Sequence, residues 1–109
     1  MKKREFYTLF NKPKAENMRG IKKVEGYSID DRIFAYQDLE LGAFWWAVDF
    51  RSGLGITRFK TLKELKTNTS EIYARLEGFI KQNGNIYEGI CHDFNDMIGK
   101  EQKDDHIHE

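Results

Sequence analysis

Six side chains of this sequence are of the types that bind other molecules by stacking and by charge. Trp45 and Phe59 lie in a predicted hairpin, and Tyr36 lies in the strand before it. Aromatic rings of this kind dominate protein interfaces, and they also stack on unpaired bases. Three nearby cations complete the predicted binding residues: Arg51, Arg58 and Lys60. Together the six side chains point to recognition of a partner and not to a reaction.

The histidine, aspartate and cysteine side chains of this sequence are of types that can catalyse reactions or bind metals, but they lack the spacing that such chemistry needs. His92 and Asp96 lie four apart on a predicted helix, where a weak surface contact is the ordinary outcome. His106 and His108 alternate near the last residue, outside any rigid element that would hold a metal. Cys91 has no second cysteine to pair with and no basic cluster to activate it. We therefore expect no catalytic residue, no cofactor and no metal site, and we expect that the protein is not an enzyme.

The strands that would carry the binding residues come first along the chain. The turn "RSG" at 51–53, with Gly53 in the left-handed region, predicts a hairpin. Residues 11–28 are polar and basic without a clear period, so we expect a loop there with a helical turn at 15–19. Four strands are predicted: 4–10, 32–37, 43–50 and 54–60.

The register of the hairpin predicts which face of the sheet each residue takes. Placing Phe50 opposite Leu54 sends one tryptophan into the core and the other outward, because neighbouring residues of a strand alternate. The pairs predicted by this register are Val48 with Ile56, Ala47 with Thr57, Trp46 with Arg58 and Trp45 with Phe59. The predicted core face is Phe44, Trp46, Val48, Phe50, Leu54 and Ile56. The opposite, open face holds Trp45, Asp49, Thr57 and Phe59.

Helices follow the strands. Thr61 and Glu64 have the spacing of a capping box. Asn68 has the position of a second N-cap, and Gly84 is predicted to end the second helix with a positive φ. The predicted helices cover 62–66, about 69–82 and about 86–98.

The order of these elements predicts an α+β fold. It consists of an antiparallel sheet of about four strands, one N-terminal strand plus a three-stranded meander, followed by two or three helices packed on one face. We expect one domain over residues 1–99 and a polar, flexible tail over residues 100–109.

The charges cancel over the whole chain but are arranged in blocks. Residues 1–23 carry eight Lys/Arg against two acidic residues, and residues 82–109 carry two against seven. Nucleic-acid-binding domains are usually basic overall, so the N-terminal block alone is weak support for that function. The single cysteine, the absence of a leader-like start and the lack of an apolar run of about 20 residues lead us to expect a cytoplasmic protein without a membrane span.

The block "WWAVDFRSGLGITRFKTLKELK", residues 45–66, is a hairpin followed by a T-x-K-E helix start. It resembles a pattern found in small accessory proteins of phages, plasmids and other bacterial mobile elements. The resemblance implies a short, non-catalytic, cytosolic protein that binds or inhibits a larger host or element machine. It implies no catalytic residues.

Two functions follow from these observations. The first is an accessory or regulatory protein that binds a protein partner through the open sheet face, and a homodimer belongs to the same class. The alternative is a nucleic-acid-binding module, in which the aromatic and basic sheet face and the basic N-terminal segment contact bases and phosphates. The alternative predicts that residues 1–23 converge with Arg51, Arg58 and Lys60 on one face.

Overall fold

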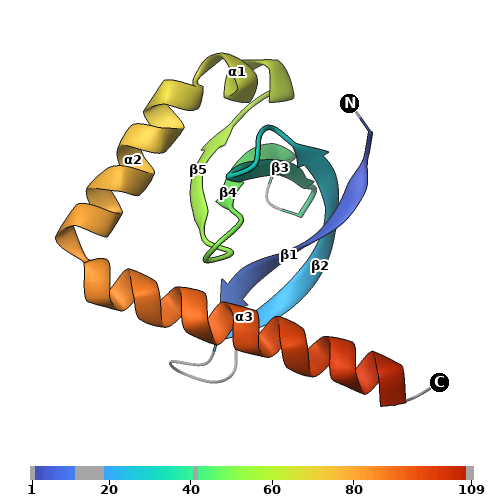
Figure 1. The fold of residues 1–109 in the computed structure, drawn as a ribbon. Helices are drawn as coiled ribbons and strands as arrows, with labels where there is room; N and C mark the ends of the chain where they lie inside the picture. Colours follow the sequence, from blue (N-terminus) through green and yellow to red (C-terminus); the bar gives the residue numbers. More distant parts are fainter. Residues whose placement is uncertain (1, 12–18, 41, 108–109) are drawn as a thin grey trace.

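A computed structural model describes residues 2–11, 19–40 and 42–107 of the chain (Figure 1). An antiparallel sheet of five strands comes first and three helices follow, which confirms the predicted α+β fold. The strands are β1 (Arg4–Asn11), β2 (Arg19–Ser28), β3 (Ile33–Asp38), β4 (Phe44–Asp49) and β5 (Gly55–Phe59). The helices are α1 (Leu62–Thr67), α2 (Thr69–Gln82) and α3 (Gly84–Ile107).

Strand β2 lies where the sequence predicts a loop. Its residues show no regular alternation, but they pair with β1 from Arg4 opposite Gly26 to Asn11 opposite Arg19. The strand is therefore determined by its partner and not by its own pattern. The sheet order is β1-β2-β3-β4-β5, so each strand pairs with the next along the chain. The helical turn predicted at 15–19 falls almost entirely on residues outside the described ranges.

The sheet curls so that β1 approaches the turn between β4 and β5. The backbone N–H of Leu9 and the hydroxyl of Thr8 both donate to the carbonyl of Gly53, each at 2.9 Å. Phe6 of β1 stacks on Phe34 of β3, two strands away, with ring centroids 4.4 Å apart. The curl thus creates an inner face with its own core. This core consists of Phe6, Phe34, Tyr36 and Val48, with Val24, Trp46 and Phe50 packed against it.

The helices cover the outer face of the sheet, and here the predicted faces are wrong. Trp45 and Phe59 lie on the side covered by the helices, whereas Trp46 lies on the inner face. Both sides of β4 bury apolar side chains, so alternation alone does not say which side the helices take. The paired residues Ala35 and Ala47 leave room for the helices to approach. The core under the helices consists of Ile33, Ala35, Ala47, Phe59, Leu65, Ile72, Leu76, Tyr87 and Cys91.

The hairpin register is confirmed except near the turn. Trp45 pairs with Phe59, Trp46 with Arg58 and Ala47 with Thr57, as predicted. A bulge after Ala47 then brings Val48 opposite Gly55 instead of Ile56. Gly53 has the predicted positive φ, 72°. The turn closes one residue earlier than predicted, because the N–H of Asp49, and not that of Phe50, donates to the carbonyl of Leu54 at 2.9 Å.

The helix boundaries follow the predictions at the start and depart from them at the end. The side chain of Thr61 accepts from the N–H of Glu64 at 3.0 Å, which confirms the cap of α1. Asn68 makes no side-chain cap for α2, and its amide donates instead to the carbonyl of Glu64 at 2.7 Å. Gly84 begins α3, and α3 continues to Ile107, so the first part of the predicted tail is helical.

Candidate binding surfaces

The structure does not bring the predicted aromatic residues together. Phe59 is 9% exposed and lies in the core under the helices. Tyr36 is 8% exposed and lies on the inner face, on the other side of the sheet. Trp45 is half-buried beside Tyr27, with ring centroids 6.1 Å apart. The predicted open aromatic face is therefore covered.

The three predicted cations are also divided between surfaces. Arg51 follows β4 and lies over the ring of Tyr87 in α3, 5.6 Å from its centroid. Arg58 lies on the inner face, 4.5 Å from the centroid of the Phe44 ring. Lys60 is exposed just after the end of β5. No single face holds all six predicted residues.

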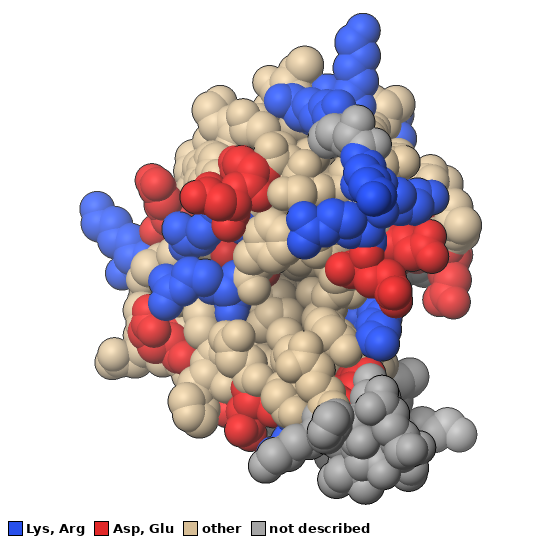
Figure 2. Space-filling model, turned by 45° about the vertical axis from the view of Figure 1, so that its right-hand side comes forward, with Lys and Arg blue, Asp and Glu red and all other residues tan. Residues whose placement is uncertain are grey.

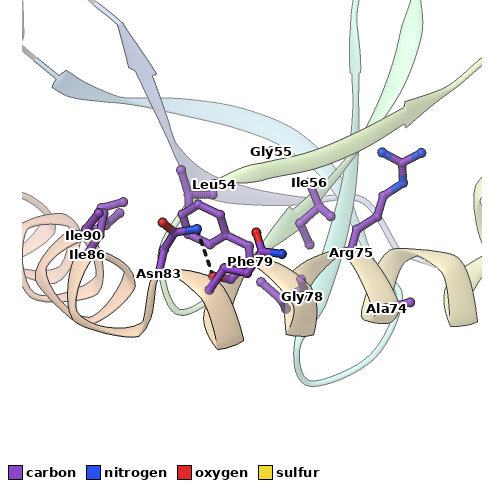
Figure 3. Close-up of a pocket in the computed structure, with 12 residues that line it drawn as sticks. Leu54, Gly55, Ile56, Ala74, Arg75, Gly78, Phe79, Asn83, Ile86 and Ile90 are labelled. Atoms are coloured by element: carbon purple, nitrogen blue, oxygen red, sulfur yellow. Dashed lines mark hydrogen bonds between the residues drawn. The ribbon is translucent and has the colours of Figure 1, made fainter.

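An open groove of about 720 Å³ lies between β5 and α2 and reaches the start of α3 (Figure 3). Figure 3 shows Leu54 and Phe79 facing each other across it, with Ile56 above Gly78. Ile86, at the α3 end of the groove, is 59% exposed, so its apolar surface is open to a ligand there. The sequence signal for this groove was limited to Ile86, which lies outside the apolar stripe of its helix.

One feature favours a ligand in the groove. The strand β5 is the last of the sheet, and within the described ranges it pairs with β4 alone. Its second edge therefore offers backbone donors and acceptors.

A buried carboxylate lies under the turn between β4 and β5. Asp49 is 0% exposed and accepts hydrogen bonds from the hydroxyls of Tyr87 at 2.6 Å and Ser52 at 2.7 Å. The Nε of Arg32 lies 3.3 Å from its other oxygen, Oδ1. In the described part of the chain, no buried side-chain nitrogen or oxygen lacks a hydrogen-bond partner. The cluster thus ties the start of β3, the end of β4 and α3 together.

The pKa values of Tyr87 in this cluster and of the neighbouring Cys91 are both raised. Burial, together with the hydrogen bond to Asp49, raises the pKa of Tyr87 well above its usual range. Burial also raises the pKa of the Cys91 thiol, although Tyr87 partly opposes the shift. A protonated phenol and a neutral thiol are poor nucleophiles, so the cluster orders the fold without presenting a reactive group. Sequence reasoning missed it because Arg32, Asp49 and Tyr87 are far apart along the chain.

A second carboxylate organises the turn before β3. The Oδ1 of Asp30 accepts from the backbone N–H groups of Arg32 and Ile33, both at 2.8 Å, and its Oδ2 accepts from the Tyr73 hydroxyl of α2. Burial disfavours the charge on Asp30, but the hydrogen bonds from Tyr73 and the two N–H groups outweigh it and lower the pKa of Asp30. Burial and the hydrogen bond to Asp30 raise the pKa of Tyr73 to about 12.

His92, four residues before Asp96 on α3, lies beside Asp93 instead. His92 lies 3.7 Å from Asp93, and both side chains are exposed. Asp96 instead pairs with Lys100 at 3.2 Å. The described residues contain no group of three side chains that could hold a metal ion. The side chains of His106 and His108 lie outside the described part.

Neither a protein-family model, nor a curated protein, nor a solved structure matches this chain. Among the described residues, no helix is both long enough and apolar enough to cross a membrane. A proposal for the function therefore depends on the surfaces of the molecule itself.

Proposed function

We propose that this chain is a small, non-catalytic accessory or regulatory protein of the cytoplasm that binds an extended segment of a partner protein. The groove between β5 and α2 carries the proposal, because it combines apolar walls with a strand edge that no other described strand pairs with. Extended peptides bind such edges by adding a strand and placing alternate side chains in a neighbouring pocket. The resemblance of residues 45–66 to accessory proteins of phages and other mobile elements supports a partner in a larger host or element machine.

The walls of the groove favour aliphatic side chains in the partner. Leu54, Ile56 and Phe79 are only partly buried, and Ile86 is largely exposed. Full burial of an exposed apolar side chain of this size contributes about 1.5–3 kcal/mol, and covering one that is already partly buried contributes less. The one charged side chain of the wall, Arg75, is paired with Glu71 at 3.3 Å on the same helix. We therefore expect a partner segment with aliphatic residues at every second position and no requirement for charge.

Selection of a displayed random-peptide library on the immobilised protein tests the proposal. We expect enriched peptides with alternating aliphatic residues that lose about tenfold or more in affinity, roughly 1.4 kcal/mol, when Gly78→Leu fills the groove. The matched control is Gly99→Leu in α3, where an added Cβ also meets no atom within 4 Å. Peptides that bind Gly78→Leu as tightly as the unmodified protein would overturn the proposal, and so would a library without any enrichment.

A second copy of this chain is the competing occupant, because an exposed strand edge can also pair with its own counterpart. Sedimentation equilibrium over a wide range of protein concentration distinguishes a second copy of the chain in the groove from a peptide of another protein. A dimer that forms with rising concentration and is abolished by Ile86→Asp would place a second copy in the groove and overturn the peptide proposal. A monomer at all concentrations is the result we expect.

A further inference from the structure

A row of side chains crosses the inner face of the sheet from one edge to the other. The strand registers place Arg4 opposite Gly26, Gly26 opposite Tyr36, Tyr36 opposite Trp46, and Trp46 opposite Arg58. Directly paired residues point to the same side of a sheet, and neighbouring strands lie about 4.8 Å apart. The row therefore has two aromatic rings in its centre and an arginine at each end.

The arginines of this inner row are exposed and held against aromatic rings. The guanidinium of Arg58 lies 4.5 Å from the centroid of the Phe44 ring. The guanidinium of Arg4 lies 5.2 Å from the centroid of the Phe6 ring. Such contacts orient a cation without neutralising it, so both arginines remain available to an anion.

A third cation joins the inner row from β2. The ammonium of Lys22 lies 5.6 Å from the centroid of the Tyr36 ring. Among the described strand residues of this face, the one acidic side chain is Asp38, which pairs with Phe44. Burial raises the pKa of Tyr36, and the charge of Asp38 adds to the shift. The face is thus positive although the whole chain has zero net charge. Figure 2 shows Lys and Arg side chains over much of the upper half of the molecule, with clusters of Asp and Glu beside them.

Trp46 is the ring of the inner row that a ligand can reach. It is half-buried, whereas Tyr36 is 8% exposed. A Cβ on Gly55 would come 3.0 Å from the indole, so the ring lies directly on the backbone of β5. A ring that is already held in place loses little freedom when a ligand stacks on it.

We infer that this inner row is a second binding surface and that it takes single-stranded nucleic acid. A partly exposed indole such as that of Trp46 can stack on bases with little sequence preference, while flanking Arg and Lys neutralise the phosphates. An acidic peptide would use the cations but would leave Trp46 without a planar partner. A duplex keeps its bases stacked within the helix, where a ring seated in a curled sheet does not reach them.

Some of the basic residues predicted to share one face do lie together on the inner face. Arg4 and Lys22 from the N-terminal segment share the inner face with Arg58, while Arg51 lies beside α3. Lys12 and Lys14 lie outside the described residues. The surface also differs from the predicted one in its tryptophan, since Trp46 and not Trp45 belongs to it.

Fluorescence anisotropy with a labelled oligothymidine of about 16 nucleotides tests the inference. We expect affinity to fall as salt rises, with a slope of log K against log salt of about −0.7 for each phosphate contacted. The double variant Arg4→Gln/Arg58→Gln should reduce that slope by about 1.4. In the variant Trp45→Phe, Trp46 is the single remaining tryptophan. Its emission should change on binding and saturate together with the anisotropy.

The matched control is Arg75→Gln/Lys81→Gln, which removes the same charge from α2 and should leave the slope unchanged. Gly78→Leu should also bind the oligonucleotide as the unmodified protein does. Failure of the peptide-binding proposal would therefore leave the nucleic-acid inference standing. Trp46→Leu should weaken binding by about fivefold or more. If urea unfolding shows that Trp46→Leu is not folded, the inference is decided by the double arginine variant and by the emission of Trp46. Lack of binding at low salt, equal loss in the α2 control, or tighter binding of a duplex would overturn the inference.

Discussion

The hydroxyl of Tyr87 donates a hydrogen bond of 2.6 Å to the carboxylate of Asp49 and thereby joins α3 to the end of β4. Both side chains are 0% exposed. The same carboxylate accepts from Ser52 in the hairpin turn and faces the guanidinium of Arg32. A charge taken out of water is tolerated only when its lone pairs are satisfied, so the docking of α3 and the shape of the turn depend on each other.

Tyr87→Phe should lower the free energy of unfolding by about 1–3 kcal/mol, because it leaves a buried carboxylate short of one donor. Urea unfolding followed by circular dichroism measures the change. Tyr7→Phe is the control, since it removes a hydroxyl from a half-buried ring on β1 that contacts the Lys23 ammonium at 5.8 Å. The control should change stability by less than about 0.5 kcal/mol. Equal effects of the two substitutions would contradict the role of the hydrogen bond.

Stability should also decline as the pH rises above about 10, the usual pKa of tyrosine. Burial and the hydrogen bond to Asp49 raise the folded-state pKa of Tyr87. A group with a raised pKa contributes stability that is fully present below its unfolded pKa and is lost as the pH rises through the folded one. Urea midpoints measured from pH 8 to pH 12 should therefore fall less steeply in Tyr87→Phe than in the unmodified protein. Parallel declines would show that Tyr87 titrates normally.

Part of the local chemistry, although not the predicted Asn68 cap, was predictable from the sequence because neighbouring residues determine it. The Thr61 cap, the positive φ of Gly53 and the pairing of Trp45 with Phe59 each depend on residues within one hairpin or one helical turn. Strand β2 was not predictable in the same way. Its lysines and glycines favour a loop. It forms a strand because it pairs with β1, which lies earlier in the chain.

The surfaces were less predictable because they arise from packing between distant elements. Alternation correctly separates Trp45 from Trp46, but the curl of the sheet buries side chains on both faces and so hides which face the helices cover. The groove between β5 and α2 results from how a helix sits beside an edge strand. The inner row needs the registers of four strand pairs at once, and one of those strands was not predicted.

Asp30→Asn should destabilise the protein at neutral pH and make little difference in acid. The hydrogen bonds from Tyr73 and two backbone N–H groups outweigh burial and lower the pKa of Asp30. A carboxyl group with a lowered pKa contributes stability that is present above its unfolded pKa, about 4, and is lost as the pH falls through the folded one. The gap in urea midpoint between the two proteins should thus close as the pH drops from 6 to 3. A gap that is constant with pH would exclude a charge effect.

Cys91 should react slowly with a thiol reagent while the protein is folded. The thiol is 6% exposed, and burial raises its pKa, so both access and the thiolate fraction are reduced. At pH 8 we expect modification at least about tenfold slower than that of a free thiol, and rates that rise with urea as the helices open. The variant Cys91→Ser gives the background rate. Modification of the folded protein at the rate of a small thiol would mean that α3 is not docked as described.

Two glycine substitutions should change stability in opposite directions. Gly78→Ala should raise the free energy of unfolding by about 1 kcal/mol, because alanine favours the helix and the new Cβ meets no atom within 4 Å. Gly53→Ala should lower it by more than about 1 kcal/mol, since the backbone there has a φ of 72° and the added Cβ would collide with the ring of Phe94. Urea unfolding of both variants measures the two signs. A loss of stability in Gly78→Ala would mean that side chains already fill the groove, and the peptide-binding proposal would lose its site.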